Sequence, residues 1–512
     1  MQELKEFAEH TKKVLSASDM QAIELNAAAL GVSGSQLMEN AGMAVAKFIE
    51  KQFAKSKNVL VICGLGWKGG SGFAASRHLI KNHHVTIGIV GYEKNVRFGP
   101  ALEDLKIIRQ SPFGDVIENV QAHSNVLNGK DVIVDAVFGV GFHGKMTEGA
   151  STLIKKVNDS KTPVVSIDIP SGLDANTCVS HTLIAADYTV TFHKEKSCLD
   201  GLASAGKVVV EDIGIPIEAE IFAGPGDLML ARRPRSIYSS KHDNGSVVII
   251  AGSRDYHGAP VLAANAVYNA LAALRMGTGY VHLYVPAAIE DAARRLSPNV
   301  IVRRFGTDYI SDGDFESVKE AVKKADAVII GMGIGRDEST LDMAARIIDT
   351  AVAEGKKIVI DADAIYAVKR AQRLGKDAVL TPQDIEFHEL SGLTLKKNDL
   401  AERFINAVSV ARKLNASLLL KGHDTIITDG EVAKIVRSDT SALATMGTGD
   451  VLSGIIGGYA AIGATVFESA TAGAYLHATI GGLLALEKGN HILAVDVVDK
   501  IPKIIKDFDE SV

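Results

Sequence analysis

A glycine-rich turn followed directly by an acidic residue, Gly-Thr-Gly-Asp at 447–450, lies where a loop gives way to a long apolar stretch. Gly447 and Gly449 allow backbone N–H groups to converge on an anion at the start of the predicted helix, where the helix dipole also favours negative charge. Asp450 then stands where a carboxylate can take a proton from a hydroxyl that attacks a phosphate. The tetrapeptide predicts phosphoryl transfer, although an ordinary turn with Asp450 as the helix cap would have the same sequence.

Two further segments carry features of a phosphate-binding site. Lys421 and Gly422 follow the predicted strand SLLL, and Thr425 comes shortly after, an arrangement suited to gripping the phosphates of a nucleotide. A second glycine turn, GMGIG at 331–335, follows another apolar run. Because the carboxyl ends of parallel strands share one edge of an open α/β sheet, we expect these segments to meet there.

A glycine motif in the first half follows a strand and precedes a helix. Gly64, Gly66 and Gly69 in VLVICGLGWKGGSG satisfy the GxGxxG pattern of dinucleotide-binding folds. Glu93, after the next predicted strand, lies about where a ribose-binding acid is found in such folds. Glycine turns after a first strand occur in many α/β folds, so the motif alone does not identify the ligand.

Strand-like apolar runs alternate with helical patterns along the chain, which predicts parallel sheets with helices on both faces. In the first half these runs lie at 58–63, 85–90, 131–139, 163–170 and 188–192. In the second half they lie at 246–252, 280–286, 327–335, 357–364, 378–382 and 417–422. The chain is therefore predicted to be an α/β protein, with an N-terminal Rossmann-like three-layer domain and a second α/β domain.

The length of 512 residues is too great for one ordinary hydrophobic core. The strand and helix alternation is lost at 225–236, where prolines, a glycine and arginines gather as in a domain connection. We place the domains at 1–225 and 238–512, with a linker at 226–237. The two halves share no motif, which favours fusion of two different enzymes over duplication.

Composition and charge bear on partners and location. A net charge of -6 offers no basic face for nucleic acid, and the acidic first residues do not have the pattern of a signal peptide. The apolar run at 451–467 is shorter than the roughly 20 residues that a membrane span needs, so we predict a buried helix there and no membrane partner. His477, in the next apolar helical pattern, is predicted to be a hydrogen-bonded core histidine.

The cysteines are few and have no motif spacing. Cys63, Cys178 and Cys198 form no CxxC pair and are odd in number, which predicts neither a disulfide framework nor a thiolate metal site. This usage is typical of a reducing compartment, and we predict the cytoplasm.

Several motifs of the second half occur in an order that resembles the ADP- or ATP-dependent NAD(P)H-hydrate dehydratases, which have a ribokinase-like fold. The motifs are HGAPVLAANAVYNALAALRMGTGYVHLYVP (257–286), GMGIG (331–335), IDADAIYAV (360–368), LTPQDIEFHEL (380–390), KGHDT (421–425), GTGDVLSG (447–454) and AGAYLHATIGGLLA (472–485). The resemblance covers about 270 residues. It implies a C-terminal ribokinase-like domain that dehydrates the 6S form of NAD(P)H hydrate at the expense of ADP or ATP, with Mg²⁺.

The same resemblance implies residue roles in this half. Asp450 is the catalytic base and contacts the hydrated cofactor. The nucleotide is held by Lys421, Gly422, His423, Asp424, Thr425, Gly447, Thr448 and Gly449, and the hydrated cofactor is bound by Ala259, Gly333, Gly335 and Gln383. Gln383 departs from the family, which usually has His there; glutamine can form hydrogen bonds but cannot titrate, so we expect binding without proton transfer at this position.

The first half resembles the NAD(P)H-hydrate epimerases through LMENAG (37–42), DAVFGVGFHG (135–144), SIDIPSGLDANT (166–177) and ADYTVTFHKEK (186–196). The resemblance runs over roughly the first 215 residues. It implies that Asp168 is the catalytic or substrate-binding carboxylate and that Gly139, Val140 and Gly141 approach the phosphates of the cofactor. Asp135 and Ser171 would belong to a potassium site.

The glycine loop departs from this family, which usually reads GNNGGDG. Trp67, Lys68, Gly69, Gly70 and Ser71 stand there instead and would line the hydrated-cofactor pocket, with Trp67 either stacking on the ligand or filling the loop. An ammonium cannot ligate potassium, so we hypothesise that Lys68 takes the place of the ion and reaches Asp135 and Ser171. The alternative is that this domain has lost epimerase activity and survives as a binding or oligomerisation module.

The resemblances predict a bifunctional enzyme that repairs the hydrates NADHX and NADPHX and forms a homo-oligomer. The alternative for the second half is a small-molecule kinase of the ribokinase superfamily, of the hydroxymethylpyrimidine or hydroxyethylthiazole type, with a non-catalytic nucleotide-binding module before it. Such a kinase would accumulate a phosphorylated product, whereas a dehydratase releases inorganic phosphate.

Overall fold

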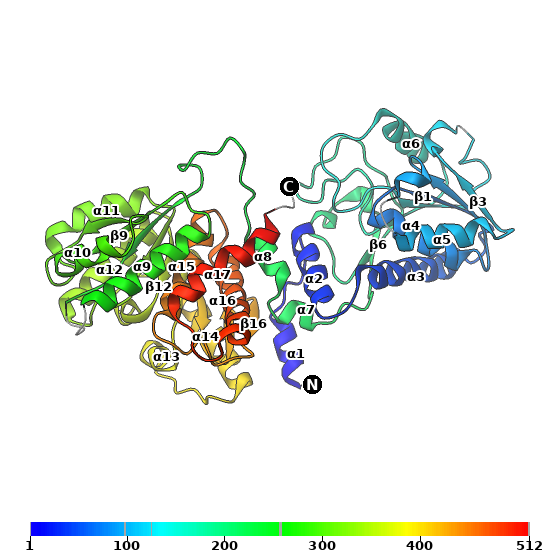
Figure 1. Cartoon of the computed structure of the whole chain (residues 1–512). Helices are drawn as coiled ribbons and strands as arrows, with labels where there is room; N and C mark the ends of the chain where they lie inside the picture. The colour runs from blue at the N-terminus through cyan, green and yellow to red at the C-terminus, as the bar shows by residue number, and fades with distance from the viewer. Residues whose placement is uncertain (1, 97–98, 124, 255–258, 510–512) are drawn as a thin grey trace. The chain divides into compact units, whose positions relative to one another are not determined.

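The computed structural model describes residues 2–96, 99–123, 125–254 and 259–509. It forms two compact units, each considered by itself (Figure 1). The N-terminal unit is Lys12–Pro216. The C-terminal unit consists of the described residues up to Thr11 and from Ile217 onward.

The N-terminal unit is built on a sheet of seven parallel strands in the order β3-β2-β1-β4-β5-β6-β7. Its elements are α2 (Ala17–Ala29), α3 (Gly34–Gln52), β1 (Asn58–Cys63), α4 (Trp67–Leu79), β2 (His84–Ile89), α5 (Gly99–Arg109), β3 (Gly114–Ile117), β4 (Val132–Ala136), α6 (Glu148–Asp159), β5 (Val164–Ile167), β6 (Tyr188–Phe192), η3 (Ser197–Leu199) and β7 (Lys207–Glu211). In β1, Leu60 and Ile62 pack in one core cluster with α6, while α4 lies on the opposite face of the sheet (Figure 1). The predicted three-layer arrangement is confirmed.

The C-terminal unit is built on nine strands in the order β10-β9-β8-β11-β12-β13-β14-β15-β16, of which only the last two run antiparallel to their neighbours. Its strands are β8 (Ser246–Ile250), β9 (Tyr280–Val285), β10 (Ile301–Arg304), β11 (Ala327–Ile330), β12 (Lys357–Ile360), β13 (Ala378–Leu380), β14 (Ser417–Leu420), β15 (Asp424–Thr428) and β16 (Ala433–Arg437). Its helices are α1 (Gln2–Glu9), α7 (Glu218–Ile221), α8 (Pro225–Ala231), α9 (Ala259–Arg275), α10 (Ala287–Leu296), α11 (Phe315–Lys324), α12 (Glu338–Ala353), α13 (Asp384–Ser391), α14 (Leu400–Leu414), α15 (Thr448–Ala461), α16 (Val466–Lys488) and α17 (Ala494–Ile505). This is the second α/β unit that the apolar runs predict.

In the C-terminal unit, alternate side chains of a strand pack against the helices on opposite faces of the sheet. Val247 and Ile249 of β8 pack in a cluster with α9, α15 and α16. Val248 and Ile250 point to the other face and pack with α11, α12 and α14. Because successive side chains of a strand face opposite ways, a continuous apolar run is buried on both sides.

The order of strands reverses between β1 and β4 in the N-terminal unit and between β8 and β11 in the C-terminal unit. The loops that leave the carboxyl ends of the two central strands turn to opposite faces at such a point and leave a crevice between them. These are the places in the two sheets where a ligand site is expected.

The chain divides differently from the sequence-based boundaries of 1–225, 226–237 and 238–512. Helix α1 belongs to the C-terminal unit, where Phe7 is buried against Phe404 with ring centroids 4.4 Å apart. Residues 225–231 form α8 rather than a linker, since its apolar Leu228 and Ala231 are buried in the cluster that contains α16. Composition alone does not reveal which unit a short amphipathic helix will join.

The expectation that the cysteines form no disulfide is wrong for one pair. Cys178 and Cys198 are joined by a disulfide within the N-terminal unit, with Cα atoms 5.2 Å apart, whereas Cys63 is free and buried. The loop after β5 packs on η3 through Leu173, Ala175 and Leu199, which brings two cysteines separated by 20 residues together. Pairing at this range is set by tertiary packing, so motif spacing does not reveal it. The prediction of a reducing compartment loses this support.

The apolar run at 451–467 is buried as predicted, but it is not one helix. Helix α15 ends at Ala461 and α16 begins at Val466, with Gly463 between them at a φ of 114° that favours glycine. Among the described residues, no helix is long and apolar enough to cross a membrane.

Candidate functional site

The predicted phosphate turn lies at the start of α15, whose first residue is Thr448. Gly447 is the N-cap with a φ of 87°, and a Cβ there would lie 3.0 Å from Asn265 Oδ1 of α9. Asp450 lies in the first turn of the helix, and its backbone carbonyl accepts a hydrogen bond of 2.8 Å from Asn269 Nδ2. The Thr448 hydroxyl donates within the turn, to Leu443 O or Thr445 O. Helix α9 therefore fixes the turn from one side.

A buried ion pair, Asp361 with Lys421, lies on the other side of the turn that begins α15. Asp361, 2% exposed, follows β12 and accepts hydrogen bonds from Lys421 Nζ at 2.7 Å and Thr381 Oγ1 at 2.6 Å, and from the Ser453 hydroxyl of α15. The Lys421 ammonium lies 3.6 Å from where a Cβ of Gly449 would be. A phosphate bound at the turn would therefore meet both the N–H groups of α15 and this ammonium.

The charges of this cluster shift its pKa values. Burial and, after it, the neighbouring Asp361 together raise the pKa of Asp450 to about 7, while Lys421 acts to lower it. Burial also acts to raise the pKa of Asp361, but Lys421 and the hydrogen bonds from Ser453 and Thr381 outweigh it and hold that pKa low. Burial acts to lower the pKa of Lys421, but Asp361 outweighs it and the pKa is raised. Asp361 and Lys421 thus stay ionised as a pair, while Asp450 exchanges a proton near neutral pH.

The hairpin of β14 and β15 carries the other predicted nucleotide residues. A Cβ at Gly422 would lie 2.8 Å from Arg403 Nη2, and that guanidinium donates to Lys421 O at 3.0 Å and to Asp384 at 2.7 Å. His423 is exposed, Asp424 Oδ1 lies 3.4 Å from Arg437 Nε, and Thr425 Oγ1 donates to Gly422 O at 3.2 Å. Arg403 thereby holds the backbone of Lys421, whose side chain pairs with the buried Asp361.

The predicted cofactor residues lie along the same edge of the sheet. Gly333 and Gly335 follow β11 with φ values of 63° and 92°, and the Gly335 amide donates to Asp363 Oδ2 at 3.1 Å. Gln383 is exposed at the N-terminus of α13, after β13. Ala259 is the first residue of α9, and its side chain is outside the described part of the structure.

Three residues at this edge are not among the predicted site residues. Asp361 anchors Lys421; it is the second residue of the IDADAIYAV motif and directly follows an apolar strand, but neither signal reveals this contact. Ser253, after β8, is buried beside Gly335 and its hydroxyl has no hydrogen-bond partner among the described residues. His477 bonds to the Thr448 backbone, but its buried Nε2 has no partner in the described part of the chain, which differs from the fully hydrogen-bonded core histidine that the sequence predicts. Burial lowers its pKa to about 4.

The N-terminal unit gathers its predicted residues at the carboxyl ends of β1, β4 and β5. Lys68, in the first turn of α4, is 8% exposed. Its Nζ lies 3.1 Å from Asp135 Oδ2, 2.9 Å from Ser171 Oγ, 3.1 Å from Phe138 O and 2.6 Å from Ile169 O. The sequence-based hypothesis that Lys68 reaches Asp135 and Ser171 agrees with this geometry.

Asp168 has a strained backbone and lies beside charged side chains. Its φ of 61° is uncommon for a residue with a side chain, and such strain is found most often at functional sites. Its Oδ1 accepts from Thr191 Oγ1 at 3.0 Å and lies 3.0 Å from Nζ of the buried Lys196. The carboxylate is therefore held in one orientation at the end of β5.

The remaining predicted residues surround Lys68. A Cβ at Gly139 would lie 3.2 Å from Lys68 Cβ, so the loop 139–141 passes directly over this side chain. Ser71 is buried and its Oγ is 3.5 Å from Trp67 O. Trp67 is half exposed, and its ring lies 3.0 Å from where a Cβ of Gly34 would be. Stacking of Trp67 on a ligand stays a prediction.

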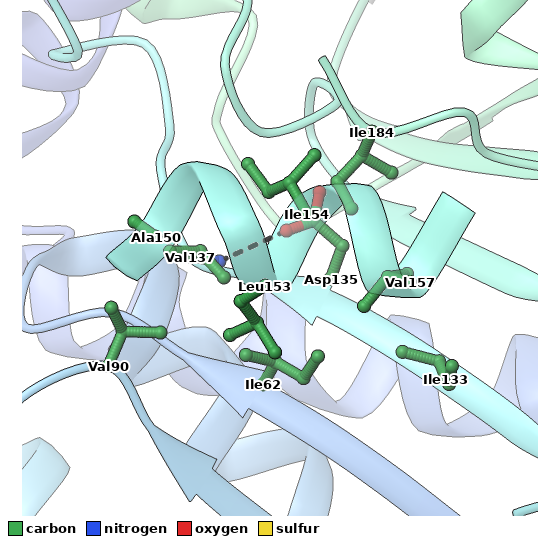
Figure 2. A pocket seen from close by; sticks show the side chains of 10 residues that line it. All are labelled: Ile62, Val90, Ile133, Asp135, Val137, Ala150, Leu153, Ile154, Val157 and Ile184. Carbon is green, nitrogen blue, oxygen red and sulfur yellow. Dashed lines mark hydrogen bonds between the residues drawn. The ribbon is translucent and has the colours of Figure 1, made fainter. Parts of the chain in front are cut away.

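A cavity in the N-terminal unit lies between α6 and the strands β1 and β4, and Asp135 is the only polar residue among the ten that line it (Figure 2). Figure 2 shows the Asp135 carboxylate accepting a hydrogen bond from the Val137 amide, at 3.2 Å. The other nine lining residues are aliphatic, so this is a gap in the core and not a polar ligand site. The aliphatic surroundings leave Asp135 dependent on hydrogen-bond donors and positive charge for its stability.

The donor sets decide which of the predicted cofactors fit. The described residues contain no cluster of three or more His, Cys, Asp or Glu side chains that would hold a metal ion. The turn of α15 with Lys421 suits nucleotide phosphates, and Mg²⁺ would arrive with them. The oxygens of Asp135, Ser171, Phe138 and Ile169 are already contacted by Lys68, so potassium does not fit there beside it.

Comparison with known proteins matches both units. A family described as NAD(P)H-hydrate dehydratase matches residues 247–503, and one described as YjeF-related protein N-terminus matches residues 34–198. The bifunctional NAD(P)H-hydrate repair enzymes Nnr of Methanothermobacter thermautotrophicus and Pyrobaculum aerophilum are 36% and 34% identical, each over 96% of this chain and over 95% and 98% of their own lengths. Relatives with these names do not favour the kinase alternative.

Among solved structures, an ADP/ATP-dependent NAD(P)H-hydrate dehydratase from Bacillus subtilis, co-crystallised with ATP and Mg²⁺, is 25% identical. It covers 55% of this chain and 96% of its own, with a TM-score of 0.46.

The substitution Asp450→Asn is expected to stabilise the C-terminal unit above pH 7. The carboxyl has a pKa of about 7 in the folded protein against an ordinary value of 3.8, so the folded state keeps a proton that the unfolded chain has released. Stability therefore falls as the pH rises from about 4 to about 7, and asparagine escapes this loss, which we expect to amount to about 4 kcal/mol. Urea unfolding across this range measures the difference; the exposed Asp439→Asn is the control, and a gain that does not change with pH would contradict the assignment.

Proposed function

The chain belongs to the family of bifunctional NAD(P)H-hydrate repair enzymes, and from this premise we propose how its two units act on NADHX and NADPHX. The C-terminal unit dehydrates the 6S hydrate at the expense of ADP or ATP. The N-terminal unit interconverts the 6R and 6S hydrates, so that both reach the dehydratase site. The observation that carries the proposal is the place of Asp450 in the first turn of α15, after the Gly447 N-cap, where burial raises the pKa of its carboxyl to about 7.

The proposed reaction makes the hydroxyl at C6 of the reduced ring a better leaving group. ADP or ATP with Mg²⁺ supplies a phosphoryl group for this hydroxyl. Asp450 takes the hydroxyl proton as the oxygen–phosphorus bond forms and the phosphoanhydride bond breaks. The C6–O bond then breaks with release of inorganic phosphate as the ring nitrogen donates its electron pair, and loss of a proton from C5 restores the dihydronicotinamide.

The surrounding residues have separate roles in this proposal. Lys421 and the N–H groups of the 447–449 turn hold the negative charge of the transferred phosphate. Asp361 acts as a positioning residue because it fixes the Lys421 ammonium. Gly333, Gly335 and Gln383 lie at the edge where the hydrated cofactor would bind. Ser253 and His477 offer further polar atoms there that have no partner among the residues that the structure describes.

In the N-terminal unit we assign Asp168 to the epimerisation step as the group that exchanges a proton with the substrate. Lys196 and Thr191 hold its carboxylate, and the loop 139–141 would receive the cofactor phosphates. The alternative, in which this unit has lost its activity, is decided by supplying the full chain with the 6R hydrate.

The cytoplasm and a homo-oligomeric state stay predictions. The proposed reaction needs only small molecules and neither a nucleic acid nor a membrane. ADP and ATP are both compatible with a site that grips phosphates through backbone N–H groups and one lysine.

The substitution Asp450→Asn tests the dehydratase assignment. Loss of the base is expected to lower nucleotide-dependent recovery of NAD(P)H at least 100-fold, on the order of what general-base catalysis contributes. The absorbance of the reduced nicotinamide ring and the release of inorganic phosphate measure the reaction, with Asp439→Asn as the matched control. Undiminished turnover would remove Asp450 from the mechanism, and a phosphorylated product without recovery of NAD(P)H would favour a kinase.

The substitution Asp168→Asn tests the epimerase assignment. In the presence of excess nucleotide the wild-type chain should consume both hydrates, whereas Asp168→Asn should consume the 6S hydrate normally and the 6R hydrate only at the spontaneous rate. The exposed Asp115→Asn is the control. Equal consumption of the 6R hydrate by Asp168→Asn and wild type would contradict the role of Asp168, and failure of the wild-type chain itself would show that the unit is inactive.

A further inference from the structure

Four oxygen atoms converge on the Lys68 ammonium from two loops of the N-terminal unit. Asp135 Oδ2 and Phe138 O come from the end of β4 and the loop that follows it, while Ile169 O and Ser171 Oγ come from the loop after β5. The nitrogen–oxygen distances lie between 2.6 and 3.1 Å. A carboxylate, a hydroxyl and two carbonyls are also the donor types of an oxygen-lined cation site.

Each of these oxygens requires a hydrogen-bond donor at the nitrogen. The two carbonyls and the carboxylate only accept hydrogen bonds. The Ser171 hydroxyl gives its own hydrogen to Asp135 Oδ1 or Phe138 O, so its oxygen also accepts from Lys68. A neutral amine has two hydrogens and a lone pair, whereas an ammonium has three hydrogens. The arrangement therefore calls for the charged form of Lys68.

The positive charge of Lys68 also stabilises the buried Asp135 carboxylate. Asp135 is 1% exposed, and the aliphatic cavity of Figure 2 lies on one side of it. Burial lowers the pKa of Lys68, while Asp135 and Asp168 act to raise it; Asp135 is the carboxylate that the ammonium contacts. Without a cation at this point, a carboxylate and two carbonyls would face one another in a nearly dry interior.

We propose that Lys68 is a covalently tethered cation that replaces a bound monovalent ion in this unit. The ammonium ties the loop after β4, which carries Gly139–Gly141, to the loop after β5, which carries Asp168. Lys68 is thus a positioning residue, and the N-terminal unit neither needs nor binds potassium. The inference concerns the pocket of the proposed epimerisation but rests only on the geometry of Lys68, so its test does not depend on that activity.

The test measures thermal unfolding of the full chain in chlorides of potassium, ammonium and choline at equal ionic strength. The wild type should unfold at the same temperature in all three. Lys68→Ala leaves Asp135 buried without its partner and should lower the unfolding temperature of the N-terminal unit by about 10 °C in choline. Potassium or ammonium ions can enter the vacated space and should restore most of the loss, whereas choline is too large.

Lys130→Ala is the matched control. Lys130 is a half-buried lysine of the same unit whose Nζ donates to Thr86 Oγ1 at 2.6 Å. Asp115 acts to raise its pKa, but among the described residues no carboxylate forms a salt bridge with it. Its removal should produce no difference between the three salts. Dehydration of the 6S hydrate by the C-terminal unit, measured in each variant, shows that the rest of the chain is intact.

A second variant keeps the inference open to refutation if Lys68→Ala does not fold. Lys68→Asn provides an amide oxygen as an additional cation ligand and should unfold at a higher temperature in potassium than in choline. Equal unfolding temperatures of Lys68→Asn in the two salts would overturn the proposal. A wild-type chain stabilised by potassium relative to choline would overturn it as well, whether or not the unit epimerises its substrate.

Discussion

The buried pair of Asp361 and Lys421 is the interaction on which the dehydratase site depends. Asp361 lies at the end of a central strand, and its hydrogen bonds to Lys421, Thr381 and Ser453 connect three elements that are distant in sequence. The pair costs solvation energy, and its oxygens are satisfied by hydroxyls on both sides. It places one positive charge at the helix terminus. Burial is the main cause of the raised pKa of Asp450, and the two charges of the pair act on that pKa in opposite directions.

The N-terminal unit also contains a buried carboxylate that is paired with a lysine, Asp135 with Lys68. Asp135 lies at the end of β4, as Asp361 follows β12, and each carboxylate is neutralised by an ammonium that comes from another segment. In the N-terminal unit the lysine lies near the switch point of the sheet, between β1 and β4, where a doubly wound sheet opens a crevice. In the C-terminal unit the pair joins the carboxyl ends of β12 and β14, on the same edge of the sheet as the switch point between β8 and β11.

Much of the fold and part of the candidate site were predictable from the sequence, because local patterns of residues indicate them. Buried strands read as apolar runs, and the Gly-Thr-Gly-Asp turn marked the start of α15 by its own chemistry. The contact of Lys68 with Asp135 and Ser171 was predictable because Lys68 stands in the glycine loop where the resembled family usually has asparagine. Asp361 lies in the IDADAIYAV motif, but its pairing with Lys421 does not follow from that motif. This pairing, the disulfide of Cys178 and Cys198, and the placement of α1 depend on contacts between distant segments, which no local pattern contains. The buried polar atoms of Ser253 and His477, which have no hydrogen-bond partner within the described ranges, likewise result from the folded structure and not from a local pattern.

The central claim is that the Asp361–Lys421 pair holds Asp450 ready to exchange a proton near neutral pH. Its most direct measurement is a carbon-13 NMR titration of the Asp450 carboxyl, assigned by its absence in Asp450→Asn, in the wild type and in Lys421→Met. The account predicts a wild-type pKa of about 7 that moves upward when Lys421 is lost, because the lowering charge is removed and Asp361 remains. A carboxyl that titrates near its ordinary value of 3.8, or one that does not respond to the loss of Lys421, would contradict it.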